Sequence, residues 1–123
     1  MGYRSKVAIA IHRDVQGEFL TFLNTERLMA DIFGDRSSFN LDKDFQADGH
    51  WLFTADSIKW YETWDEYADI QMFAKFFEAM DEANGTIQKY RFIRVGEQND
   101  DVEERGQWFD SDIHVKREIA IGW

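Results

Sequence analysis

The sequence predicts an α+β domain in which helices cover one face of an antiparallel sheet. Three observations support this: segments of alternating apolar residues, segments with apolar residues at helical spacing, and their βαββαββ order along the chain. The first six elements match a ferredoxin-like βαββαβ arrangement, and the seventh is an extra C-terminal strand. We expect residues 1–123 to form one domain, since 123 residues is a typical single-domain length.

The beginning of the chain predicts one strand followed by helix. Residues 5–12 alternate in the manner of a strand. Asp14 is placed to cap a helix whose apolar positions fall within residues 15–23. A second helical pattern, at residues 28–33, either continues that helix or forms a short one of its own, and Gly34 is the expected stop.

The middle of the chain predicts a connector and two strands. Residues 35–49 are polar with little periodicity, which is typical of a connector. Residues 51–55 and 58–61 are rich in aromatic and β-branched residues and are predicted to be strands. A hairpin around Asp56 and Ser57 is the natural interpretation, and a single bulged strand is the alternative.

The most regular helical pattern follows. Thr63 and Glu66 form a capping box, and apolar residues then recur on one stripe up to Met80. A turn is expected at 84–85 and a strand at 86–95.

The end of the chain predicts an acidic loop and a closing strand. Residues 97–112 hold seven acids and one arginine, and residues 113–121 alternate as a strand.

The composition limits the possible chemistry and location. The absence of cysteine excludes disulfides, thiolate metal ligands and cysteine nucleophiles, and it fits a reducing compartment. No segment approaches the roughly 20 apolar residues of a membrane helix, and the N-terminus lacks the apolar core of a signal peptide. We therefore expect a cytoplasmic protein that does not bind membranes.

Reactive motifs are absent from the sequence. His12, His50 and His114 are scattered, without the spacing of a metal site. Residues 40–44 resemble the start of a calcium loop, but Phe45 stands where glycine is required. There is no glycine-rich phosphate loop and no nucleophile elbow. We expect no catalytic residue, no metal and no cofactor, and hence a protein that is not an enzyme.

The charge favours a basic partner. With 24 acids against 14 lysines and arginines, the formal charge of −10 disfavours nucleic acid and attracts cationic proteins. Acids of the second long helix and of the acidic loop are candidates for a partner-binding stripe that mimics a nucleic-acid backbone. These are Asp65, Glu66, Asp69, Glu97, Asp100, Asp101, Glu103 and Glu104. A solvated surface that maintains solubility is the other interpretation.

Two further functions remain open. Basic residues on the predicted strands, with Tyr61, Tyr90 and Phe92, are compatible with a sheet that stacks RNA bases, although the net charge opposes it. The surplus of aromatic residues, or an exposed strand, is compatible with a homodimer that serves as a structural or assembly factor.

Three predicted strand residues, Lys59, Arg94 and Arg117, are candidates for a polar cluster. They could pair with Glu97, Asp100 or Asp101 and hold the acidic loop against the sheet. The two interpretations are ordinary surface ion pairs and a preorganised polar site.

Landmarks along the chain resemble a family of small uncharacterised proteins of tailed phages and prophages. They are residues 2–8 (Gly-Tyr-Arg-Ser at the start), residues 58–61 (with Lys-Trp-Tyr), residues 94–101 (Arg-x-Gly-Glu-x-x-Asp-Asp) and Arg117. That family has no assigned catalytic residues. The resemblance implies a phage accessory protein in a bacterial cytoplasm and, by analogy, an inhibitor of host machinery such as restriction or CRISPR systems.

Overall fold

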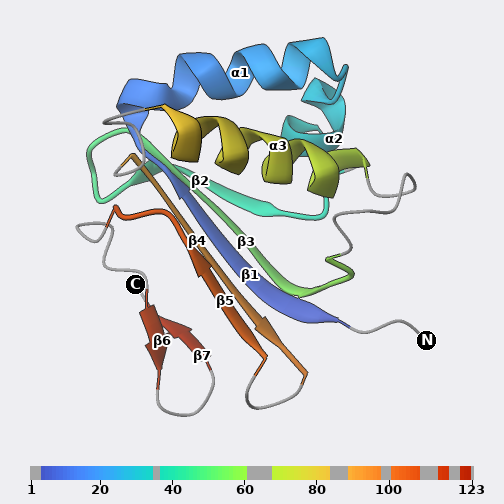
Figure 1. The fold of residues 1–123 in the computed structure, drawn as a ribbon, viewed down its shortest axis with the longest axis vertical. Coiled ribbons are helices and arrows are strands. Elements are labelled where there is room, and N and C mark those ends of the chain that lie inside the picture. The colour runs from blue at the N-terminus through green and yellow to red at the C-terminus, as the bar shows by residue number, and fades with distance from the viewer. Residues whose placement is uncertain are drawn as a thin grey trace.

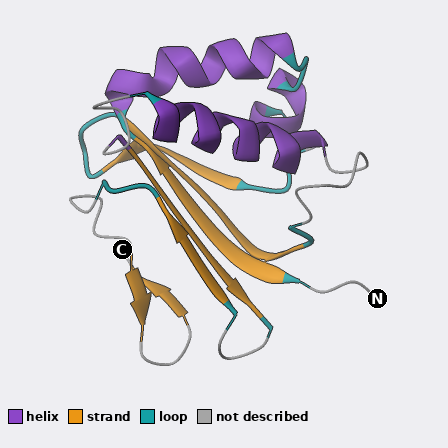
Figure 2. Cartoon of the chain, in the orientation of Figure 1, coloured by secondary structure: helices purple, strands orange, loops and turns teal. Residues whose placement is uncertain are grey.

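Three α-helices lie on one face of a five-stranded antiparallel sheet, and a two-stranded sheet accompanies it (Figure 1). Figure 2 shows the helices gathered as one layer above the strands. The computed structural model describes residues 4–34, 37–60, 68–83, 89–97, 101–108, 114–116 and 120–122, the last two ranges as backbone only. This arrangement confirms the predicted α+β class, with the helices on one face of an antiparallel sheet.

The sheet is built around the first strand of the chain. Its members are β1 (Ser5–Ile11), β2 (Asn40–Phe45), β3 (His50–Ile58), β4 (Tyr90–Gly96) and β5 (Val102–Arg105). They are ordered β2-β3-β1-β4-β5, and every neighbouring pair is antiparallel. β1 is therefore the central strand, paired on both sides.

The helical layer begins with a tight turn. Its elements are the 3-10 turn η1 (Arg13–Val15), α1 (Gln16–Thr25), α2 (Met29–Phe33) and α3 (Ala68–Glu82). The prediction that Asp14 caps the first helix is wrong, because the chain enters through η1 and His12 is the capping residue. α2 is a separate helix that ends before Gly34, and Arg27, with a φ of 58°, interrupts the path from α1.

α3 confirms the helix predicted up to Met80 and extends it to Glu82. The predicted capping box of Thr63 and Glu66 lies outside the described residues, as does the turn at 84–85. Among the described helices, none is long and apolar enough to cross a bilayer.

Two strand predictions in the middle of the chain are corrected. The connector at 35–49 contains β2, an edge strand whose mostly exposed polar residues carry no apolar alternation. The hairpin around Asp56 and Ser57 is wrong, because β3 runs through both residues. A register shift opposite the beginning of β1 places a bulge there, so the alternative of a single bulged strand is the observed one.

The C-terminal predictions are corrected in the same way. The acidic loop at 97–112 contains β5, which pairs with β4 at the edge of the sheet. Residues 113–121 do not form one strand of that sheet. They contribute β6 (His114–Lys116) and β7 (Ala120–Gly122), which pair only with each other in the described structure, and β7 lies against β1 and β4. The extra strand of the main sheet is thus β5.

Aromatic rings fill the space between the sheet and the helices. Phe73 of α3 is fully buried, and its ring centroid lies 5.5 Å from that of Phe19, 5.3 Å from that of Phe39 and 5.6 Å from that of Phe53. These rings come from α1, the segment before β2, and β3. One side chain therefore joins the helical layer to the sheet.

The opposite face of the sheet is buried as well. Ala8, Ala10 and Ile93 are fully buried there, and Trp108 packs in the same cluster. The backbone of β7 lies against β1 and β4. Small side chains on β1 permit this close approach.

Truncating Phe73 tests the aromatic core. Phe73→Ala should lower the free energy of unfolding by about 3–5 kcal/mol, because the surrounding rings cannot refill the cavity. Urea denaturation measures this loss. Met29→Ala is the control, since Met29 is 38% exposed and should change stability by at most about 0.5 kcal/mol. Equal effects of the two substitutions would contradict this description of the core.

Candidate functional site

Arg94 of β4 forms the largest polar network among the described residues. Its side chain is 16% exposed and donates two hydrogen bonds to Asp101, at 2.7 and 3.1 Å. It also donates to Glu103 Oε1 at 3.2 Å and to Ser5 Oγ at 3.1 Å. Through these hydrogen bonds, Arg94 holds Asp101 and β5 against the central strands of the sheet. The hydrogen bonds to Asp101 raise the pKa of Arg94 further, so it stays charged.

The other β5 charges are paired too. Glu104 accepts a hydrogen bond from Arg91 at 2.6 Å, and register places both on the sheet face opposite Arg94. Arg105 pairs with Asp81 of α3 at 3.3 Å. Asp81 also accepts a hydrogen bond from the Tyr90 hydroxyl at 2.7 Å, and burial raises the pKa of that hydroxyl. β5 is thus fixed by arginines on both faces.

The predicted site residues therefore separate into several groups. Asp101 and Glu103 join Arg94, whereas Glu104 joins Arg91 on the other face. Glu97 instead accepts a hydrogen bond from the backbone N–H of Arg4 at 2.9 Å. Among the described candidates, Asp69 and Lys59 do not join these networks. Asp69 and Lys59 lie at a cavity described below, and Asp65, Glu66, Asp100 and Arg117 lie outside the described residues.

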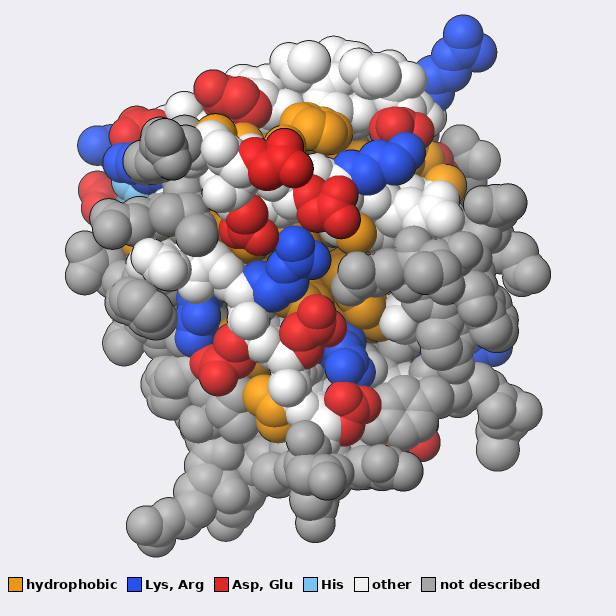
Figure 3. Space-filling view, viewed as in Figure 1, with side chains coloured by type: hydrophobic (Ala, Val, Ile, Leu, Met, Phe, Trp, Pro, Cys, Tyr) orange, Lys and Arg blue, Asp and Glu red, His pale blue; other side chains and the backbone are white. Residues whose placement is uncertain are grey.

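Three exposed acids of the helices have no ion pair to the described residues. Glu18 of α1 and Glu78 and Glu82 of α3 are exposed and make no ion pair with any part of the chain described here. Figure 3 shows acidic side chains predominating over the helices, while acidic and basic side chains alternate over the strands below. The carboxylates of Glu103 and Glu104 on β5 are therefore neutralised by arginines, whereas those of Glu18, Glu78 and Glu82 on the helices are not.

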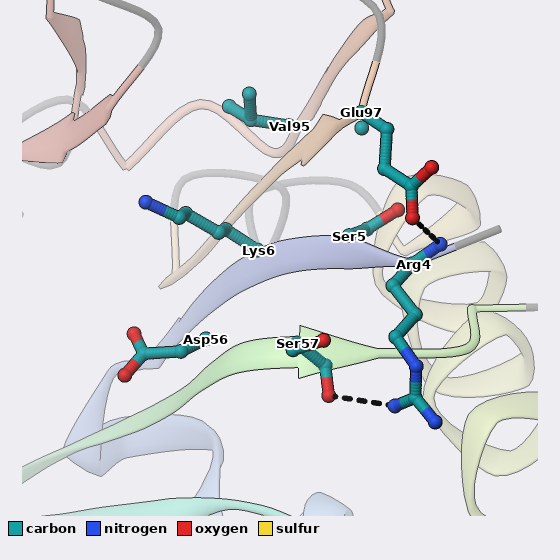
Figure 4. Close-up of a pocket in the computed structure, with 8 residues that line it drawn as sticks. Arg4, Ser5, Lys6, Asp56, Ser57, Val95 and Glu97 are labelled. Atoms are coloured by element: carbon teal, nitrogen blue, oxygen red, sulfur yellow. Dashed lines mark hydrogen bonds between the residues drawn. The ribbon is translucent and has the colours of Figure 1, made fainter.

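Two cavities flank Arg4 at the beginning of β1. The first, of about 180 Å³, is bounded by the ends of β3 and β4, and Figure 4 shows Lys6, Asp56 and Glu97 around it. The second, of about 410 Å³, lies toward the beginning of α3. Arg4 and Ser57 line both cavities, and the Arg4 guanidinium donates to the Ser57 carbonyl at 3.3 Å.

Two histidines meet at the opposite end of β1. The ring centroids of His12 and His50 are 4.4 Å apart, and Trp108 packs against both at 5.1 and 4.7 Å. Each Nδ1 accepts a backbone N–H at 3.0 Å, from Asp14 and Arg13 respectively. Burial lowers the pKa of both imidazoles, which are thus neutral acceptors.

Spacing in the sequence gave no signal for this pair, but strand register does. Ile11 of β1 pairs with Trp51 of β3, and the two strands are antiparallel. His12, which follows β1, therefore lies opposite His50, the first residue of β3. Within the described residues, no group of three or more histidine, cysteine, aspartate or glutamate side chains could hold a metal ion.

Two of the three aromatic residues considered for base stacking are buried. Tyr90 and Phe92 are fully buried in the core between sheet and helices. Tyr61 lies outside the described residues. The two described rings therefore form no stacking platform.

Comparison of the chain with protein-family models, with curated proteins and with solved structures finds no match.

Removing the Arg94 side chain tests its role in holding β5. Arg94→Met should destabilise the protein by about 1–3 kcal/mol, because Asp101 and Glu103 lose a charged donor. Hydrogen exchange should accelerate first at β5 amides. Lys75→Met is the control, since Lys75 is exposed and its pair with Glu26 should contribute less than about 1 kcal/mol. Unchanged exchange in β5 would contradict the role.

The histidine pair predicts a pH dependence of stability. Because the folded pKa values lie below the unfolded value of about 6.5, the unfolded state binds more protons as the pH falls below that value. Stability should be full above pH ~7 and decline toward pH ~5. His12→Asn/His50→Asn should flatten this decline, since an amide oxygen can replace each Nδ1 acceptor. Urea denaturation across this range measures it, and an unchanged slope would contradict the interpretation.

Proposed function

We propose that this protein is a non-enzymatic binding protein whose helical layer docks a basic protein partner. The observation that carries the proposal is the separation of charges on the surface. Acids of β5 are neutralised by Arg91 and Arg94, whereas exposed Glu18, Glu78 and Glu82 on the helices have no ion pair to the described parts of the chain. Uncompensated acids steer a cationic partner during encounter.

This proposal revises the predicted docking surface. Asp101, Glu103 and Glu104 were expected to face a partner, but each already accepts a hydrogen bond from an arginine. Releasing them would break a network that anchors β5. The helical acids can meet a partner without that cost.

The resemblance to small tailed-phage proteins suggests the setting. In that setting the partner would be a basic host protein in a bacterial cytoplasm, one that handles nucleic acid or defends the cell, as restriction and CRISPR proteins do. We also propose a ferredoxin-like arrangement for β1 to β4 with α1 and α3. The strand order β2-β3-β1-β4 supports it, with β5 as the addition.

Homodimerisation through a sheet edge has less support. β2 is an edge strand that carries Asp42 and Asp44, and β5 is the other edge and carries Glu103 and Glu104. Pairing two copies through β2 would bring like charges together, whereas the acids of β5 are already paired with arginines. Burial of Tyr90 and Phe92 likewise weakens the nucleic-acid alternative.

Neutralising the helical acids tests the proposal. Tagged protein should retain a partner from bacterial lysate at low salt and release it at high salt, because the attraction is screened. Glu78→Gln/Glu82→Gln should weaken that binding about tenfold, or ~1.4 kcal/mol. Binding to the purified partner is then measured calorimetrically.

The matched control removes the same charge elsewhere. Asp48→Asn/Asp56→Asn changes two exposed acids outside the three α-helices and should leave the affinity unchanged. If both variants weaken binding equally, or no salt-sensitive partner is retained, the proposed docking surface is wrong.

A further inference from the structure

The larger cavity beside Arg4 is bounded by both positive charge and hydroxyl groups. It measures about 410 Å³ and lies between the end of β3, the first turn of α3 and Ser38, which precedes β2. Arg4 and Lys59 are the two basic residues that line it, and they come from opposite ends of neighbouring strands. A cavity of this size accommodates a small organic molecule.

Unlike several other basic residues, Arg4 and Lys59 have no counter-ion among the described residues. In the described structure, Arg91, Arg94, Arg105, Lys75 and Lys89 each pair with a carboxylate. Arg4 and Lys59 make no ion pair with any described residue, and the Arg4 guanidinium makes its hydrogen bond to a backbone carbonyl. Lys6, Arg13, Arg27 and Lys43 are also without ion pairs to described residues, but Arg4 and Lys59 share one cavity.

The acid in the cavity does not compensate them. Asp69 Oδ1 accepts the backbone N–H of Ile70 at 2.9 Å, and Asp69 makes no ion pair with the described bases. Burial raises the pKa of Asp69, and the charge of Asp31 adds to that rise. The positive charges of Arg4 and Lys59 therefore remain available.

Two hydroxyl groups complete the set of donors. Ser38 and Ser57 line the same cavity, and within the described ranges neither hydroxyl makes a side-chain hydrogen bond. A guanidinium, an ammonium and hydroxyl groups are the donors that carboxylates and phosphates prefer. We infer that this cavity binds a small organic molecule through a carboxylate or phosphoryl group held by Arg4 and Lys59.

The inference is independent of the basic partner proposed above, and its test uses the purified chain alone. Inorganic phosphate and acetate are titrated separately at constant ionic strength while amide NMR shifts are recorded. Amides of Arg4, Ser57 and Lys59 should shift in a saturable manner with phosphate, with acetate or with both, and the stronger probe identifies the anionic group.

Charge-removing variants give the decisive comparison. Arg4→Gln and Lys59→Gln should each weaken binding at least about tenfold, since each removes a charged hydrogen-bond donor. Arg27→Gln removes the same charge from an exposed position outside the cavity and should bind like the parent. The dispersion of the amide spectrum verifies that each variant is folded. Absence of saturable shifts with either anion, or equal weakening by Arg27→Gln, would overturn the inference.

Discussion

The burial of β1 on both faces is the constraint on which the rest of the structure depends. Every residue from Val7 to Ile11 is at most 2% exposed. Alternating side chains point to opposite faces, so Ile9 needs the helices while Ala8 and Ala10 need cover on the other side. The helical layer covers the first face, and Trp108 packs on the second. A central strand of this kind also fixes the registers of β3 and β4, because it pairs with both.

That constraint explains why polar features gather at the two ends of β1. The strand interior accepts only apolar and small residues, so polar side chains can begin only where the burial ends. At the beginning lie Arg4, Ser5 and the Arg94 network, together with both cavities. At the other end lie His12, His50 and Trp108. Each cluster joins segments that are distant in sequence, and each therefore forms only when the sheet is assembled.

The sequence predicted those elements whose apolar pattern reflects burial. In β1 the large apolar residues face the helices and the alanines face the opposite side, and both faces are buried. The stripe on α3 follows from one helical face meeting the core. β2 and β5 were not predicted because these edge strands are held by backbone pairing and carry mainly charged residues, which show no apolar alternation. Asp56 and Ser57 resemble a turn because a bulge, like a turn, tolerates polar residues without apolar neighbours.

The candidate sites differ in how well the sequence predicts them. Arg94 and Asp101 are seven residues apart across a tight connection, so their pairing was a reasonable expectation from sequence. The Arg4 cavity depends on bringing residues 4, 38, 57, 59 and 69 together, and no local pattern encodes that. The histidine pair required knowledge of the β1–β3 register. The sequence therefore predicts contacts between residues that a short connection separates. Contacts between distant segments can be predicted only when the strand order is known.

A net charge of −10 is compatible with an anion-binding cavity, because the distant acids are screened by salt whereas the cations of the cavity contact the anion directly. A charge at ~4 Å from a cation gains about 4 kcal/mol of Coulomb attraction near a protein surface, before desolvation is considered. Acids more than ~8 Å away are largely screened at physiological ionic strength. A small anion in contact with Arg4 and Lys59 responds mainly to those two charges and to the carboxyl of Asp69, whose pKa burial raises. A nucleic acid extends over many such distances and meets the uncompensated carboxylates of the helices as well. Local cations and a repulsive overall field can thus select a small anion against a polyanion on the same surface.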